Sequence, residues 1–120
     1  MLNRSEVLSE LDAERLRAVE AHEHFAFLLL RVHRHREEHQ LFGDFLSMAA
    51  RTRIRSAVRP QDRILPIGDN AFALILPNLR DSGHALLAAN RLVRAFREPL
   101  LVGDRLQQAL PTIGIAMFPE

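Results

Sequence analysis

The sequence contains no cysteine, lysine, tryptophan or tyrosine. The absence of cysteine excludes disulfide frameworks, thiol nucleophiles and cysteine-ligated zinc. The chain also has no apolar run near the ~20 residues that a membrane-spanning helix requires, so we expect no membrane insertion. Its first ten residues carry charge from Arg4 onward. This pattern is not that of a signal peptide, and we therefore expect a cytoplasmic location.

All sixteen basic residues are arginine, and fifteen acidic residues nearly balance them. A nucleic-acid-binding module usually concentrates its basic residues on one face and adds aromatic rings that stack on bases. Here the arginines are spread along the chain, and seven phenylalanines are the only aromatic residues. We therefore expect no nucleic-acid partner.

The 120 residues have the length and composition of one soluble globular domain covering residues 1–120. In the first half of the chain, apolar periodicity predicts a helix over 5–22 with Ser5 as its N-cap, a strand over 25–32 that is buried on both faces, and a helix from about 34 to 58 that is interrupted at Gly43. In the second half, turn residues and apolar runs predict a hairpin of strands 63–67 and 71–76, a helix over 81–96, and a second hairpin over 100–118. Pro66 indicates that strand 63–67 lies at a sheet edge or lacks one ladder hydrogen bond. This order predicts a mixed central β-sheet flanked by helices.

Four stretches resemble, in order, the motifs of the GGDEF family of bacterial diguanylate cyclases. They are Leu2-Asn3-Arg4, the strand from Phe27 to His33, the run from Arg59 to Pro77, and the final run from Thr112 to Pro119. The resemblance spans nearly the whole chain and implies a GGDEF/nucleotidyl-cyclase-like fold. Because the sequence stops at Glu120, before the family's ADxALYxAK motif, we expect the final helix and strand to be missing.

The resemblance also implies that cyclase chemistry has been lost. Active members condense two GTP molecules into cyclic di-GMP with two metal ions, and a hard cation requires carboxylate oxygens. The family's two DxD aspartates correspond to Arg31 and His33. The five positions of the GGDEF hairpin are Gly68, Asp69, Asn70, Ala71 and Phe72. We therefore expect no catalytic residues, no metal site and no Mg²⁺ cofactor.

Part of the family's nucleotide pocket is retained by the same comparison. Asp44 corresponds to the carboxylate that reads the guanine base, and Arg36 lies where a phosphate-binding lysine is usual. An alternative function is therefore a residual GTP-binding protein or diguanylate cyclase with an altered metal site, in which the charge of Arg31 replaces that of a metal.

Arg59 and Asp62 have the RxxD spacing of the family's inhibitory site, which implies cyclic di-GMP as a ligand. Arginine offers a planar donor pair to phosphate or guanine, and a carboxylate can accept from the guanine N1–H and N2–H groups. The same four residues also suit a helix stop in which Asp62 caps backbone N–H groups. The sequence leaves both interpretations open.

Taken together, these residues predict a catalytically inactive GGDEF-like regulatory module in bacterial cyclic di-GMP signalling. It would act as a cyclic di-GMP receptor through Arg59 and Asp62, or as a protein-interaction domain. Without the final helix, an apolar sheet face would be exposed, and such faces usually mark interfaces. We therefore expect a homodimer or another protein partner.

Five of the six histidines lie between His22 and His39. His35 and His39 have the i,i+4 spacing of a two-histidine metal clip, and His22/His24 and His33/His35 are alternate-residue pairs. We interpret them instead as solvated polar ends around the strand at 25–32.

Overall fold

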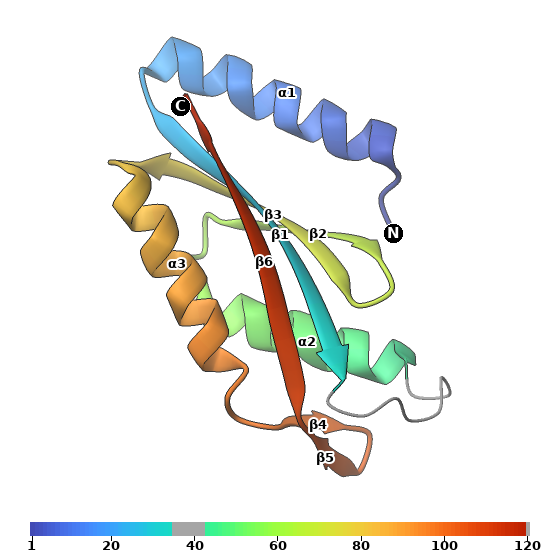
Figure 1. Ribbon diagram of the computed structural model, residues 1–120. Coiled ribbons are helices and arrows are strands. Elements are labelled where there is room, and N and C mark those ends of the chain that lie inside the picture. The colour runs from blue at the N-terminus through green and yellow to red at the C-terminus, as the bar shows by residue number, and fades with distance from the viewer. Residues whose placement is uncertain (35–42, 120) are drawn as a thin grey trace.

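The computed structural model describes residues 1–34 and 43–119 (Figure 1). Its elements are α1 (Arg4–Ala21), β1 (His24–Arg34), α2 (Gly43–Ala57), β2 (Arg63–Gly68), β3 (Ala71–Leu79), α3 (Ser82–Ala95), β4 (Leu100–Val102), β5 (Arg105–Gln107) and β6 (Ala109–Phe118). Four strands form the main sheet in the order β2-β3-β1-β6, while β4 and β5 form a separate hairpin. No helix of these residues is both long and apolar enough to cross a bilayer.

The predicted α/β class, with helices flanking a central sheet, is confirmed. Every neighbouring pair of strands in the main sheet is antiparallel, which corrects the expected mixture of strand directions between neighbours. The reason is that each helical crossover joins two strands that are not neighbours in the sheet. The crossover through α2 joins β1 to β2, which have β3 between them, and the crossover through α3 leads from β3 to β6, which have β1 between them. This is the split βαβ arrangement. Pro66 lies on β2 at the sheet edge, as predicted.

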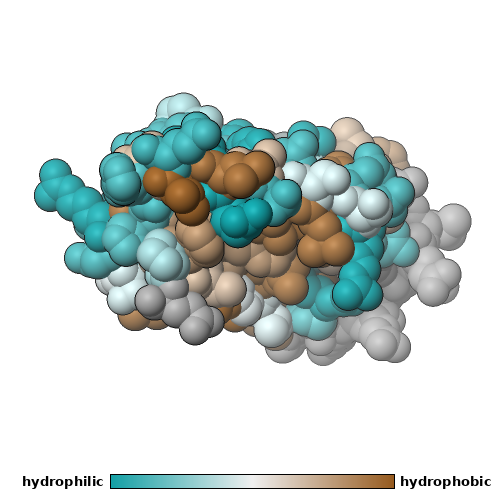
Figure 2. Space-filling view, turned by 90° about the horizontal axis from the view of Figure 1, so that it is seen from above, coloured by the Kyte–Doolittle hydropathy of each residue, from teal (hydrophilic) through white to brown (hydrophobic). Residues whose placement is uncertain are grey.

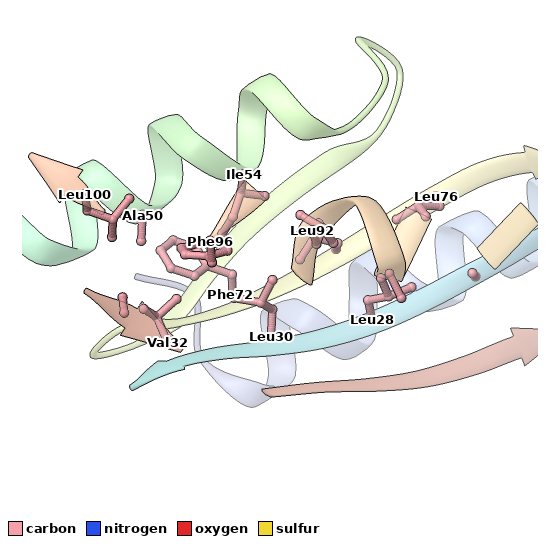
Figure 3. Close-up of a cluster of buried hydrophobic side chains, with 14 of the residues drawn as sticks. Leu28, Leu30, Val32, Ala50, Ile54, Phe72, Leu76, Leu92, Phe96 and Leu100 are labelled. Atoms are coloured by element: carbon pink, nitrogen blue, oxygen red, sulfur yellow. The ribbon is translucent and has the colours of Figure 1, made fainter. Parts of the chain in front are cut away.

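The larger core lies between the sheet and helices α2 and α3 (Figure 3). Alternate residues of a strand point to the same face, so β1 directs Leu28 and Leu30 into this layer. Ile54 of α2 and Leu92 of α3 meet them there, and all four are at most 1% exposed. Burial of these apolar side chains fixes both helices on one face of the sheet.

Helix α1 covers only part of the opposite face, near the start of β1 (Figure 1). Phe25 is buried there, but Leu29 is 47% exposed and Arg31 and His33 are exposed. The prediction that strand 25–32 is buried on both faces is therefore wrong for its second half. A continuous apolar run cannot reveal how much of a strand its neighbouring helix covers.

The apolar residues of α1 do not all pack on the sheet. Ala18 is buried and Leu11 packs beside it, whereas Leu8, Leu16 and Val19 are each more than half exposed. Figure 2 looks down on this side and shows apolar residues gathered among hydrophilic ones.

Asn3, rather than the predicted Ser5, caps α1. The Asn3 side chain accepts a hydrogen bond from the Glu6 backbone N–H at 2.9 Å, and the Asn3 N–H donates to Glu6 Oε1 at 3.1 Å. Asparagine caps as well as serine, and a glutamate three residues later completes the capping box.

Arg63 of the edge strand β2 attaches α1 to the sheet by an ion pair with Glu10 at 2.7 Å. Within α1 and just after it, Arg17 binds Glu14 at 2.7 Å and Glu23 at 2.9 Å. Hydrogen bonds from Arg17 to Glu14 and then Glu23 raise the pKa of Arg17 further above its already high value. Glu14 itself is only 6% exposed, so these cations compensate a buried charge.

Strand β1 continues to Arg34, which pairs with Ala109 of β6, and α2 begins at Gly43. The helix predicted from about Arg34 is therefore wrong at that end, because sheet pairing overrides a polar, helix-compatible sequence. Arg36, His35 and His39 lie outside the described residues, so the predictions that concern them are not addressed by the structure.

Candidate functional site

The residues predicted to carry function lie at opposite ends of β3. The hairpin positions 68–72 are at its start, and the Arg59–Asp62 turn contacts Pro77 near its end. At ~3.3 Å per residue, the two places are about 20 Å apart. The structure therefore separates the GGDEF hairpin from the RxxD turn as two sites.

The hairpin is retained as a structural turn. Asn70 adopts φ 56°, a left-handed conformation that asparagine tolerates, and its carbonyl accepts from Val32 N–H at 2.8 Å. Phe72 is 1% exposed and Ala71 is 7% exposed, so both belong to the interior. Asp69 is exposed at the tip.

Arg31 lies beside this hairpin. In the sheet register it is opposite Ala71 of β3 and Thr112 of β6, while His33 is opposite Leu110. The described residues contain no cluster of three histidine or acidic side chains that could hold a metal ion. A guanidinium repels Mg²⁺, so Arg31 itself supplies no ligand for the metal ions that cyclases use. Asp44 lies in the first turn of α2, but its side chain is not described.

The Arg59–Asp62 pair forms a closed turn at the end of α2. Asp62 Oδ2 accepts from Arg59 N–H at 2.8 Å, and Oδ1 accepts from Arg59 Nη2 at 2.8 Å. The same Arg59 Nη2 donates to the Pro77 carbonyl at 2.6 Å. Asp62 is 3% exposed. Its carboxylate therefore caps the backbone and orients the Arg59 side chain.

Arg55, which the sequence analysis did not identify, holds this turn from the last turn of α2. Its guanidinium donates to the Asp62 carbonyl at 2.8 Å and to the Arg59 carbonyl. The only sequence signal was an arginine four residues before Arg59 in a predicted helix.

A cavity of about 240 Å³ lies between this turn and α3. Besides Arg59 and Asp62, its wall contains three cationic or titratable side chains that the sequence analysis also missed: Arg80, His84 and Arg91. His84, Leu87, Ala88 and Arg91 have the i, i+3, i+4, i+7 spacing of one face of α3. That spacing was visible in the sequence, but only the packing of α3 beside the turn shows that this face meets Arg59.

Family comparison identifies the chain. All of residues 1–120 match the family model described as "Diguanylate cyclase, GGDEF domain". The chain belongs to the GGDEF family. The bifunctional diguanylate cyclase/cyclic di-GMP phosphodiesterase MucR of Pseudomonas aeruginosa is 32% identical over 77 residues, which are 64% of this chain and 11% of MucR. This GGDEF domain thus spans about a tenth of that relative's length.

Solved structures share the fold. The GGDEF domain of TpbB from Pseudomonas aeruginosa superposes with a TM-score of 0.82 at 24% identity, covering 99% of this chain and 72% of that one. The coiled coil and GGDEF domain of DgcB from Caulobacter crescentus, solved in complex with c-di-GMP, gives a TM-score of 0.67 at 18% identity, covering 98% and 65%. The predicted family and fold are therefore confirmed, and the curated relatives are cyclic di-GMP signalling proteins of bacteria.

Proposed function

We propose that this GGDEF domain is a catalytically inactive regulatory module that binds cyclic di-GMP in the cavity beside Arg59. The observation that carries the proposal is the wall of that cavity, where the guanidinium groups of Arg59, Arg80 and Arg91 come from three separate parts of the chain. Arginine presents a fork of donors that matches phosphate, and the apolar wall at Leu87 and Ala88 suits a flat base.

The inactive state is proposed from the residue types at the other end of β3. Two cyclase metal ions need several carboxylates, whereas Arg31, Asn70 and Ala71 supply one cation, one amide and one methyl group. A cation at this point opposes the binding of Mg²⁺ by direct charge repulsion.

Isothermal titration of the chain with cyclic di-GMP tests the receptor proposal. We expect measurable binding by the parent chain and about tenfold weaker binding by Arg91→Gln, because a charge-assisted contact to phosphate is lost. Arg94→Gln is the matched control, since Arg94 is an exposed arginine of the same helix outside the cavity wall. Absence of heat with the parent chain would overturn the proposal.

Incubation with GTP and Mg²⁺, followed by chromatography of the products, tests the loss of catalysis. We expect no cyclic di-GMP at any metal concentration. Formation of the product would instead support the alternative of a residual cyclase, with Arg31 compensating for an altered metal site.

A role as a protein-interaction domain is the second candidate, and the β4–β5 hairpin favours it. Leu101 and Leu106 oppose each other across this hairpin and are 63% and 72% exposed. A pair of exposed leucines on this hairpin offers an apolar contact to a second copy of the chain. Sedimentation velocity would show self-association that decreases in Leu106→Ser, and a parent chain that stays monomeric at all concentrations would exclude the homodimer.

A further inference from the structure

A second groove, with a volume of about 420 Å³, lies between α2 and the edge strand β2. Among the described residues, its wall consists of Arg51, Thr52, Arg55, Ser56 and Ile64. None of these five residues lines the Arg59 cavity. The groove thus combines two cations and two hydroxyl groups with one apolar side chain, and these wall residues include no carboxylate.

The two arginines of the groove lie one helical turn apart. Side chains four residues apart on a helix are neighbours, so the like charges of Arg51 and Arg55 repel each other. None of the ion pairs within residues 1–34 and 43–119 includes either arginine. An anion bound between the two guanidinium groups would remove this repulsion.

Arg55 is already fixed in position by the turn that follows α2. Its Nη1 donates to the Asp62 carbonyl at 2.8 Å, and its Nη2 donates to the Arg59 carbonyl. A guanidinium has five N–H donors, so these two hydrogen bonds leave three donors for a ligand, and neutral carbonyls leave its charge uncompensated. A side chain that is fixed beforehand loses less conformational entropy when a ligand binds. Arg55 is therefore a preorganised cation in the groove.

The two hydroxyl groups can also donate to an anion. Thr52 Oγ1 donates to the Met48 carbonyl at 3.1 Å, and Ser56 Oγ donates to the Arg53 carbonyl at 2.7 Å. In an α-helix such carbonyls also accept from the backbone N–H four residues further on. The hydroxyl protons can therefore rotate toward a ligand and leave the carbonyls paired.

We propose that this groove binds a diphosphate, either free or as part of a nucleotide. Guanidinium groups bind phosphate oxygens strongly, and two of them one turn apart can each hold one phosphate group, with the hydroxyls donating beside them. The proposal does not depend on the binding of cyclic di-GMP, because the groove and the Arg59 cavity share no wall residue.

Titration of the isotope-labelled chain with inorganic pyrophosphate, followed by NMR in low-salt buffer, tests the proposal at the site itself. We expect the backbone amide signals of Thr52 and Ser56 to shift and saturate. The dissociation constant from these signals should rise at least about fivefold in Arg51→Gln, because a charge-assisted contact is lost. Arg51 is exposed, so this variant should keep its fold.

Arg94→Gln on the exposed surface of α3 is the matched control, and Arg91→Gln alters the Arg59 cavity instead. Both should leave the dissociation constant at the groove within about twofold of the parent value. Signals that do not shift at Thr52 and Ser56 would overturn the proposal, and so would an equal weakening in all three variants, which would indicate unspecific attraction to a basic surface. Either failure would leave the cyclic di-GMP proposal standing.

A parallel titration with adenosine diphosphate distinguishes the two sources of the anion. If the same amide signals saturate with a dissociation constant within about tenfold of that for pyrophosphate, the groove accepts the diphosphate of a nucleotide. If only pyrophosphate shifts them, the ligand is the free anion. Saturation by adenosine diphosphate alone would overturn the proposal, because it would show that the diphosphate is not the group recognised.

Discussion

At the scale of the residue, Asp62 shows that the side chains of a motif with a ligand-binding spacing can instead bind groups of the protein itself. Its carboxylate accepts from the Arg59 backbone and guanidinium, while Arg55 donates to the two carbonyls of the same turn. A buried carboxylate needs such partners because the desolvation of its charge is otherwise uncompensated.

Asp62→Ala should therefore lower the free energy of unfolding by about 2–4 kcal/mol, since it leaves the Arg59 N–H and a partly buried guanidinium without their acceptor. Equilibrium unfolding in urea would measure the loss.

Asp12→Ala is the control for this change. Asp12 also pairs with an arginine three residues away, but both side chains are about half exposed. Its removal should cost less than about 1 kcal/mol. Equal losses in the two variants would contradict the structural role of Asp62.

At the scale of the element, α3 divides its faces between core and cavity. Ala85 and Leu92 are buried against the sheet, whereas His84 and Arg91, one position away from each, line the cavity. A helix that is anchored by one face holds the other face in a fixed position, and this is how a surface arginine comes to lie opposite a turn of α2.

The start of α1 gives an element-scale prediction. Asn3→Ala removes the side-chain acceptor of the capping box and should cost about 1 kcal/mol of stability. Ser5→Ala lies inside the helix and should change stability by less than about 0.5 kcal/mol. Thermal denaturation followed by circular dichroism would compare the two, and a larger loss from Ser5→Ala would contradict the assignment of Asn3 as the cap.

At the scale of the whole molecule, the two faces of the sheet differ in how many apolar side chains are buried under their helices. The layer under α2 and α3 contains most of the buried apolar side chains, whereas α1 is held by a small cluster around Ala18, Phe25 and Ile75 together with the Arg63–Glu10 ion pair. A helix held by few buried contacts opens more readily than one anchored in the main core.

Native-state hydrogen exchange should therefore show α1 opening before the rest of the domain. Amides in the middle of α1 are expected to exchange at least about tenfold faster than those in the middle of α3, which serves as the internal control. Equal protection of the two helices would show that α1 and the sheet unfold as one unit.

The sequence by itself determined the family and most of the helices and strands, because these depend on residue identity and on local periodicity. Strand 63–67, the Asn70 turn and the helix ending before Pro99 all follow from the chemistry of neighbouring residues. The two interpretations of Arg59 and Asp62 could not be separated in this way, since both require the same four residues.

Only the tertiary structure decided the strand order β2-β3-β1-β6, the partial cover that α1 gives to one face, and the position of Arg59, Arg80 and Arg91 on the wall of one cavity. These features arise where segments far apart in the chain pack together to bury apolar area. No local pattern encodes which surfaces meet, because that choice is made by the free energy of the assembled core.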